Sequence, residues 1–197
     1  MIQVVRANKL NNGIRKDISK LFVSSFYDMF SSFCNDKNKL ERAFNHIFDL
    51  SLFYVVLLDK EVIGIGACSD GSSSIHFNKF KLCRYLGFKR GNNMYKYLKS
   101  VLEDKNYEFD IDSECGLIEY VAVNTKYLNS NVGYTLVNHI MHDNKYIRYL
   151  AKVANNNYRG IGLFEKIGFE EFHITSPSSR EMIDLGVTNY IYYIYSK

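Results

Sequence analysis

One stretch near the middle of the chain, "LIEYVAVNTKYLNSNVGYTLVNHIM" from Leu117 to Met141, limits the fold more than any other. Its first third is an apolar, β-branched run typical of a strand, and its last third has the apolar spacing of an amphipathic helix. The polar residues between them lead into the N-terminus of that helix, where free backbone N–H groups can bind a phosphate. The stretch therefore predicts either an anion-binding loop, a degenerate form of one, or a plain connection.

The N-terminal part of the chain predicts a short strand followed by two helices. The strand is the brief apolar run Ile2–Arg6. Asp17 can cap a first helix, because apolar residues after it recur near every 3.6 positions as far as Phe33. Asn38 can cap a second helix, and Glu41 three residues later completes the pattern of a capping box.

The remaining segments alternate between strand-like and helix-like patterns. The runs "LFYVVLL" and "EVIGIGACS" meet at Asp59–Lys60, which predicts a hairpin. Residues 77–103 have the spacing of two short helices, and Gly116 opens the strand of the central stretch. Then follow the strand "IRYLAKV", a helix over Asn157–Ile167 that Asn157 caps and Gly168 stops, and the strands "FEEFHIT" and "NYIYYIYS".

This order of elements predicts an α/β (α+β) fold with a single mixed sheet and helices on both of its faces. Hydrophobic residues make up 47% of the 197 positions, so the chain can fill a core. Neither a repeat nor a Pro/Gly/Ser-rich linker divides the sequence. We therefore expect one domain over residues 1–197.

Composition argues against several classes of partner. The net charge of +4 is mild and dispersed, so we expect no nucleic-acid partner. The basic run "KFKLCRYLGFKR" is better explained as an amphipathic surface helix than as a polyanion site. No apolar run reaches the length of a membrane span, so we expect no membrane partner. Four cysteines without a C-x-x-C pair, and no signal peptide, predict reduced thiols and a cytoplasmic location.

Two motifs then arrive in a recognisable order. The strand "IEYVAV" leads into the loop "LNSNVG", and "YLAKVANNNYRGIGLFEKIGFEEF" follows. This pattern resembles the GNAT superfamily of acyl-CoA-dependent N-acyltransferases, whose loop is written R/Q-x-x-G-x-G/A and whose later helix ends in L-Y-E-K-x-G-F. The resemblance covers Phe53–Phe172, with Phe164 in place of the family tyrosine. It implies a centrally splayed sheet, with the gap between "IEYVAV" and "YLAKV".

The resemblance implies acetyl-CoA as co-substrate and no metal. Pantetheine would pair with the main chain of Val121–Val123, and the loop Leu128–Tyr134 would offer its N–H groups to the pyrophosphate. Asn131 stands where the family prefers Gly, and Asn is the next best residue at positive φ. Leu128 replaces Arg or Gln, which predicts weaker binding. The implied cofactor-binding residues are Val121, Ala122, Val123, Leu128, Asn129, Ser130, Asn131, Val132, Gly133, Tyr134, Asn157 and Phe164.

Glu119 is the candidate general base, because it precedes Val123 by four residues on the strand where many relatives carry a carboxylate. Since strand neighbours alternate, we expect Glu119, Val121 and Val123 to share one face. A backbone N–H of Val121–Val123 would stabilise the oxyanion. The competing interpretation is a solvated or hydrogen-bonded glutamate near a strand end.

Three outcomes remain open for the leaving thiolate, because Phe164 lacks the hydroxyl of the family tyrosine. The thiolate can leave unaided, Tyr158 can protonate it from a position about two turns earlier on the helix, or the protein can bind acyl-CoA without turnover.

The acceptor would be a small-molecule or peptide amine that enters beside Met29–Asp36, and the acidic segment "EFDIDSECG" would attract it. "NYIYYIYS" predicts an edge strand able to pair in a homodimer. His139 and His142 have the spacing of metal ligands, but a polar helix end is the simpler interpretation, since no third ligand is evident.

Overall fold

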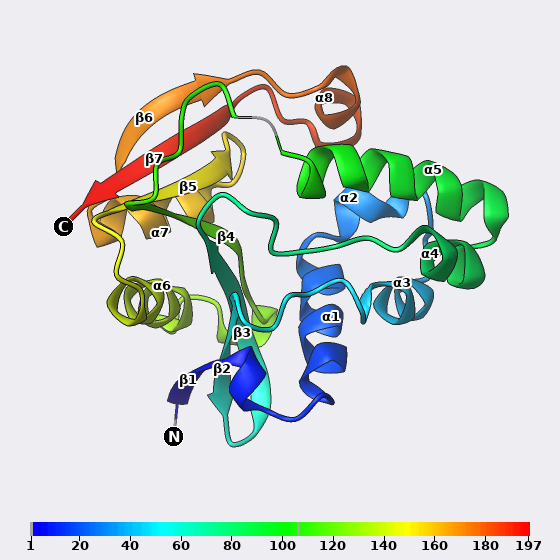
Figure 1. The fold of residues 1–197 in the computed structure, drawn as a ribbon, viewed down its shortest axis with the longest axis horizontal. Coiled ribbons are helices and arrows are strands. Elements are labelled where there is room, and N and C mark those ends of the chain that lie inside the picture. Colours follow the sequence, from blue (N-terminus) through cyan, green and yellow to red (C-terminus); the bar gives the residue numbers. More distant parts are fainter. Residues whose placement is uncertain (1, 106) are drawn as a thin grey trace.

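A computed structural model describes residues 2–105 and 107–197. Its centre is a mixed sheet, as predicted, with seven strands in the order β1-β2-β3-β4-β5-β7-β6 (Figure 1). All neighbouring strands are antiparallel except β4 and β5, which run parallel. The strands are β1 Ile2–Arg6, β2 Phe53–Leu58, β3 Glu61–Ser69, β4 Cys115–Val123, β5 Arg148–Ala154, β6 Glu170–Thr175 and β7 Tyr190–Ser196.

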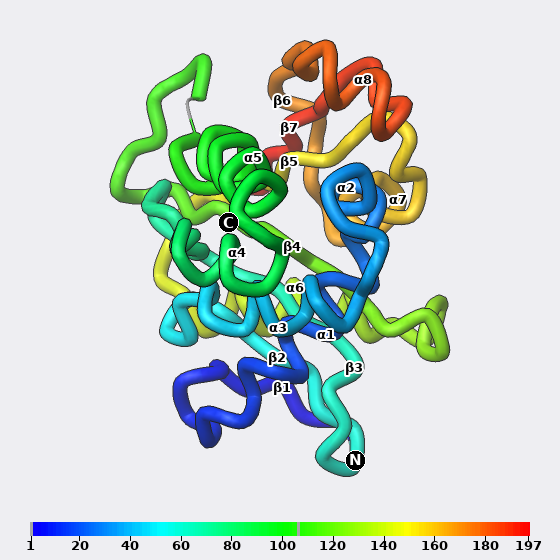
Figure 2. The backbone as a smooth tube through the Cα atoms, turned by 90° about the vertical axis from the view of Figure 1, so that its right-hand side faces the viewer, coloured from blue at the N-terminus to red at the C-terminus, as the bar shows by residue number. Residues whose placement is uncertain are grey.

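Helices cover both faces of the sheet, which also agrees with the prediction. Figure 1 shows α1 to α5 on one side of the strands and α6 and α7 on the other, and Figure 2 views the molecule from the side of α3, α4 and α5. The helices are α1 Ile14–Ser25, α2 Tyr27–Ser31, α3 Lys37–Phe44, α4 Lys79–Leu86, α5 Phe88–Leu98, α6 Val132–Asp143, α7 Tyr158–Ile167 and α8 Ser179–Leu185. Residues 7–9 and 125–127 form 3₁₀ turns, and residues 99–103 form a π-helical turn.

Each face of the sheet has its own apolar core. On the α1 side, Phe22 is 1% exposed and lies at the centre of an aromatic cluster. Five rings have their centroids 5.0–6.2 Å from the Phe22 ring, those of Phe26, Phe30, Phe44, Phe48 and Tyr120. On the other side, α6 and α7 bury their apolar stripes against Tyr149 and its neighbours.

The predicted hairpin at Asp59–Lys60 and the predicted helix α7 are both confirmed. Asp59 and Lys60 have φ of 47° and 74°, the left-handed pair that a two-residue turn between twisted strands requires. The Asn157 side chain accepts a 3.0 Å hydrogen bond from the Gly160 N–H, and Gly168 ends α7 at φ 104°.

Both N-terminal caps were predicted at the wrong residue. The first helix begins at Ile14, so Asp17 lies inside its first turn, and the helical path breaks at Phe26 into α1 and α2. Asp36, not Asn38, caps α3 and accepts a 3.1 Å hydrogen bond from the Lys39 N–H. Asp and Asn are both favoured at an N-cap, and Asp is also favoured in the first turn, so residue type alone did not separate the cap from the positions that follow it.

The C-terminal region departs from the prediction in two ways. The helix α8 was missed, although Ser178 and Glu181 carry its capping box in the sequence. β7, predicted as an edge strand, lies between β5 and β6, so the edges of the sheet are β1 and β6. An aromatic run of this kind is suited to pairing on both sides, since Tyr192 and Tyr193 are buried at 4% and 1% exposure.

Other surface features agree with the sequence. The basic run folds as α4 and the start of α5, burying Leu82 and Leu86 and leaving its charged residues outward. All four cysteines are free thiols, three of them buried. Among the described residues, no helix combines the length and the apolar character needed to cross a membrane.

Candidate active site

The two halves of the sheet separate between β4 and β5. Their parallel pairing runs from Cys115 with Arg148 to Ile118 with Ala151 and then stops. Beyond this point residues 119–123 have no strand partner on the side away from β3, within the described chain. The predicted splay is therefore present, and it leaves main-chain N–H and C=O groups open along one edge of β4.

A bulge in β4 lies at the point of separation. Tyr120 has a φ of 53°, and the β3–β4 register shifts between Ile65 and Ala67. The extra residue changes which side chains share a face. Glu119 pairs with Ala67 on the α1 side, whereas Val121 and Val123 pack against the α6 core. The prediction that these three residues share one face is wrong, because strict alternation fails at a bulge.

The gap opens onto a cavity of about 810 Å³. Its walls come from α1, α2, β4, β5, α7, α8 and β7, together with residues 100–102, 104, 105 and 107 of the segment before β4. Among the predicted site residues, Glu119, Val121, Asn157 and Phe164 line it. Met29, at the start of the predicted acceptor wall, lines it as well.

Glu119 is held by two partners in this cavity. One carboxylate oxygen accepts a 3.1 Å hydrogen bond from the Ser74 hydroxyl, and the other forms an ion pair with Lys105. The side chains of Glu119 and Lys105 are only 15% and 16% exposed. The Lys105 ammonium also lies 5.3 Å from the centroid of the Tyr120 ring. No sequence pattern indicates Lys105, because it lies outside both motifs.

Four tyrosines and a second lysine complete this side of the cavity. Burial raises the pKa of Tyr192 to about 12, and it also raises the pKa values of Tyr107, Tyr120 and Tyr190, so all four are neutral phenols near pH 7. The Lys152 ammonium lies 4.1 Å from the Tyr190 ring centroid. Desolvation inside the cavity lowers the pKa of Lys152, although water still reaches the side chain. The sequence does contain a sign of Lys152, because a lysine within the apolar run "IRYLAKV" is unusual for a buried strand.

The predicted phosphate loop leads into α6. Residues 128–131 form the connection, and Val132, Gly133 and Tyr134 make the first turn of the helix. Asn131 has a φ of 59°, as its replacement of a glycine predicted. Intrahelical bonding begins at the Thr135 N–H, and within the described chain no acceptor binds the four N–H groups from residue 131 to residue 134.

Lys166 adds a positive charge beside these N–H groups. Its ammonium donates a 3.2 Å hydrogen bond to the Asn131 side chain and lies 5.3 Å from the Tyr134 ring centroid. Leu128 contributes no charge to the loop. Lys166 was also overlooked, although it is the lysine of the "LFEKIGF" motif.

The two candidate residues on α7 lie in different environments. Phe164 is 5% exposed, borders the cavity and packs edge-on against Phe169 at 5.1 Å. Tyr158 is 81% exposed and is not among the described residues that line the cavity. The structure therefore does not bring Tyr158 together with Glu119. Asn157, in contrast, lines the cavity, and its side chain also caps α7.

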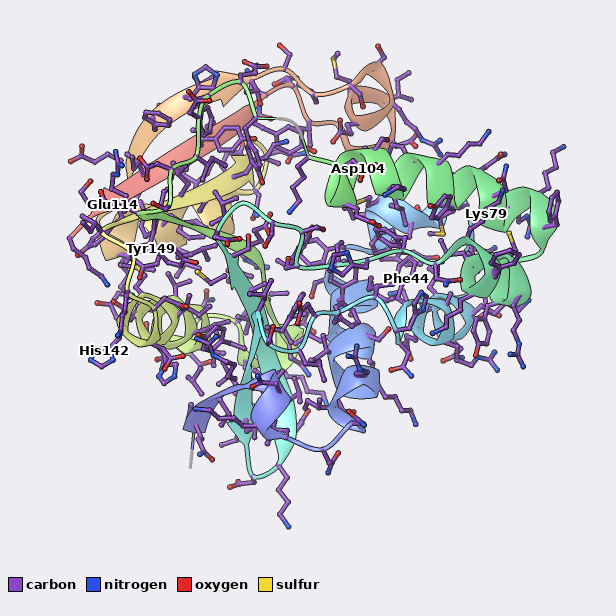
Figure 3. All side chains as sticks on the ribbon, viewed as in Figure 1. Phe44, Lys79, Asp104, Glu114, His142 and Tyr149 are labelled. Atoms are coloured by element: carbon purple, nitrogen blue, oxygen red, sulfur yellow. The ribbon has the colours of Figure 1, made fainter. Side chains whose placement is uncertain are left out.

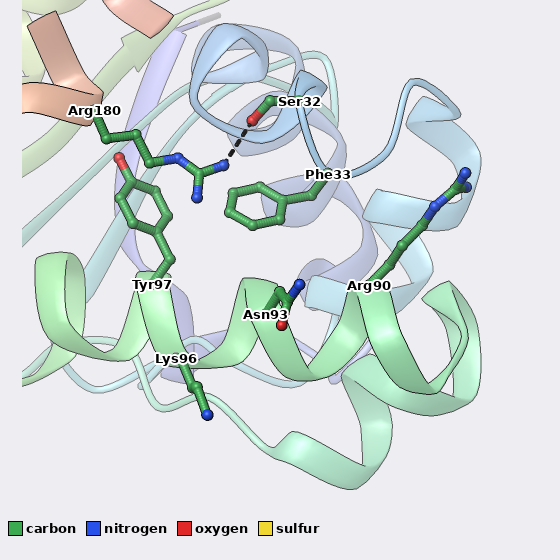
Figure 4. Close-up of a pocket in the computed structure, with 7 residues that line it drawn as sticks. All are labelled: Ser32, Phe33, Arg90, Asn93, Lys96, Tyr97 and Arg180. Atoms are coloured by element: carbon green, nitrogen blue, oxygen red, sulfur yellow. Dashed lines mark hydrogen bonds between the residues drawn. The ribbon is translucent and has the colours of Figure 1, made fainter. Parts of the chain in front are cut away.

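A second hollow of about 580 Å³ lies between α2, α5 and α8 (Figure 4). Arg180 lies 4.1 Å from the Phe33 ring centroid and 4.6 Å from that of Tyr97, and it donates a 3.1 Å hydrogen bond to the Ser32 hydroxyl. Ser32 and Phe33 of the predicted acceptor wall line this hollow, but none of the predicted catalytic or cofactor-binding residues does. Its contacts fasten α8 to α2 and α5, which holds Glu181 and Asp184 of α8 over the larger cavity.

The described residues contain no group of three His, Cys, Asp or Glu side chains arranged to hold a metal ion. His142, one of the two histidines with metal-ligand spacing, lies at the outer end of α6 (Figure 3). Two carboxylates of the acidic segment before β4 are bonded to other side chains, since Asp112 forms an ion pair with Arg148 and Glu108 lies 3.1 Å from a ring nitrogen of His173.

Comparison with known proteins places this geometry in context. The model of the Acetyltransferase (GNAT) family matches residues 15–169. An N-acetyltransferase from Staphylococcus aureus Mu50 is 14% identical, with a TM-score of 0.65 over 98% of this chain and 100% of that one. A GNAT-family acetyltransferase from Bacillus cereus ATCC 10987 is 10% identical, with a TM-score of 0.59 over 100% and 98% of the two chains. The Escherichia coli ribosomal-protein-S18-alanine N-acetyltransferase is 11% identical, with a TM-score of 0.53 over 100% and 94%. No curated protein sequence matches the chain.

Proposed function

Because the chain belongs to the GNAT acetyltransferase family, we propose that it transfers an acetyl group from acetyl-CoA directly to an amine acceptor. One observation carries this proposal. The sheet separates after Ile118 and Ala151, and the separation opens onto a cavity with Glu119 at its margin. A co-substrate held in the gap and an amine in the cavity would meet beside this carboxylate.

The chain offers a fitting site for acetyl-CoA. Four free N–H groups at the start of α6, together with the Lys166 ammonium, would hold the pyrophosphate. The open edge of residues 119–123 would pair with the pantetheine amides as an added strand does. Lys166 compensates for the charge missing at Leu128. When bound, acetyl-CoA supplies a thioester whose carbonyl carbon accepts the amine.

Two of the chemical tasks, deprotonation of the amine and stabilisation of the oxyanion, then have a group of this chain. Glu119 would take the proton that the acceptor ammonium loses, and its partial burial shields it from bulk water. An unpaired main-chain N–H near the bulge, in Val121–Val123, would stabilise the oxyanion. Direct transfer is supported because no cysteine lines the cavity among the described residues, and burial raises the pKa of Cys68 to about 12.

The charges around the cavity favour a cationic acceptor. Carboxylates outnumber ammonium groups among the lining residues, which include Asp28, Asp104, Glu119, Glu181 and Asp184 against Lys105 and Lys152. This acidic excess contrasts with the net charge of +4 for the whole chain. A small-molecule or peptide amine that carries further positive charge would therefore be drawn into the cavity.

A second candidate function is an acyl-CoA-binding module that has lost turnover. Phe164 favours it, since its ring borders the cavity where the family tyrosine would present a hydroxyl. Phe164→Tyr separates the two candidates. A gain in rate of about tenfold or more would indicate an enzyme limited by departure of the thiolate, in the range typical of general acid catalysis. An unchanged absence of turnover would favour the binding module.

The proposal is tested by calorimetric titration with acetyl-CoA, followed by a thiol-release assay with a panel of amines that includes polyamines and lysine peptides. We expect micromolar binding, and we expect Glu119→Gln to lower kcat/KM by roughly 10²–10⁴-fold without loss of binding. Glu170→Gln, on the exposed edge strand β6, is the matched control and should have no effect. Absence of binding at millimolar acetyl-CoA would refute both candidate functions.

A further inference from the structure

The proposed reaction requires an amine beside Glu119, and the Lys105 ammonium lies there. It forms an ion pair with Glu119, the carboxylate assigned as base, and both residues line the cavity at the separated strands. The pair is shielded, with side-chain exposures of 16% and 15%. The ring of Tyr120 lies 5.3 Å from the ammonium and forms a cation–π contact with it.

A nearby lysine shows what an ordinary structural ion pair looks like in this segment. Lys99 is bonded to Glu103 at 3.0 Å and to Asp104 at 2.9 Å, and it is not among the described residues of the cavity wall. Lys105 instead follows the π-helical turn on a connection outside helix and strand, and its side chain reaches into the cavity. Its ion-pair partner in the described chain is Glu119 alone.

The second lysine of the cavity lies in different surroundings. The Lys152 ammonium rests on the rings of Tyr190 and Tyr192, 4.1 and 5.8 Å from their centroids, and forms no ion pair with a described residue. It has no base in contact to take a proton. Of the two lysines, Lys105 is therefore the one arranged as an acceptor.

We propose that Lys105 is an acetylation site that the protein modifies itself, an inference that rests on the proposed acetyl transfer. The Lys105 ammonium gives a proton to Glu119, and its free electron pair then forms a C–N bond with the acetyl carbonyl carbon. The C–S bond breaks, the sulfur leaves with the bonding pair, and the second proton that the attacking nitrogen loses passes to the sulfur. The products are Nε-acetyl-Lys105 and free CoA. The amide is neutral, so it no longer forms the ion pair with Glu119.

The test is incubation of the full chain with acetyl-CoA, followed by intact mass measurement and peptide mapping. We expect Lys105 to be acetylated roughly 100-fold faster than Lys99 and Lys152, since positioning beside a base is worth at least this much. The rate should saturate with acetyl-CoA and should not depend on protein concentration, because the reaction is intramolecular. Glu119→Gln should reduce modification of Lys105 to the level of the surface lysines.

Two variants serve as controls. Lys105→Arg keeps the charge and should abolish the rapid modification, whereas Lys99→Arg should leave it unchanged. The proposal is overturned if acetyl-CoA binds and external amines are acetylated while Lys105 stays unmodified, or if Glu119→Gln modifies Lys105 at the original rate. If calorimetry detects no binding of acetyl-CoA, the proposed function fails first and this inference fails with it.

Discussion

Replacement of Phe22 by alanine tests whether this ring is central to the stability of the core on the α1 side. The ring of Phe22 is 1% exposed and touches both the helical cluster and Tyr120, whose ring centroid is 5.6 Å away. Phe→Ala substitutions in cores cost about 3–5 kcal/mol of unfolding free energy. Because Phe22 also borders the 810 Å³ cavity, water can enter the space it leaves. We therefore expect the lower end, about 3 kcal/mol.

The assay is urea unfolding followed by circular dichroism, supported by a thermal melt. About 3 kcal/mol corresponds to a fall in Tm of roughly 6–12 °C for a chain of this size. Phe80→Ala is the matched control, since Phe80 of α4 is 85% exposed and should change stability by less than about 0.5 kcal/mol. A loss at Phe22 below about 1 kcal/mol would refute the central role assigned to this ring.

Three further perturbations follow from single residues. Gly91→Ala should cost about 1–3 kcal/mol in urea unfolding, because a Cβ there would lie 2.5 Å from the Cα of Cys83 and push α5 away from α4; equal stability would contradict this. Asn131→Val should lose about 1–2 kcal/mol and weaken acetyl-CoA binding by calorimetry, since the φ of 59° disfavours a β-branched residue, while Asn131→Gly should retain both. The hydrogen bond from Tyr54 lowers the pKa of Asp143, so its contribution is complete above pH of about 4 and is lost as the pH falls through the folded-state value. Stability measured between pH 7 and pH 3 should therefore fall less steeply in Asp143→Asn, and parallel curves would argue against the linkage.

Local signals predicted most of the fold because they act through nearby backbone. The left-handed turn at Asp59–Lys60 and the cap and stop of α7 depend on residues within one turn of each other. The resemblance to the GNAT superfamily predicted the separation of β4 from β5, which no local sequence pattern indicates. The capping box of α8 was present in the sequence, at Ser178 and Glu181, and was overlooked.

The parts of the site that were missed depend on contacts between distant segments. Tyr120 adopts a φ of 53°, which its residue type disfavours, while its ring packs against Phe22, Phe26 and Phe53. Strict alternation then fails, and Glu119 turns to the other face. Lys105 reaches Glu119 across 14 positions from a segment without a motif. Neither the bulge at Tyr120 nor the ion pair between Lys105 and Glu119 is indicated by a local sequence pattern.

The place of β7 between β5 and β6 has a consequence for how the chain is made. β5 and β6 do not pair with each other, and each pairs along its length with β7, residues 190–196. While the ribosome is still synthesising the preceding residues, β5 has only its four parallel pairs with β4. Its other edge is open to a neighbouring nascent chain or to a chaperone. The part of the cavity wall that β5 forms can therefore be paired on both of its edges only after residue 196 has left the exit tunnel.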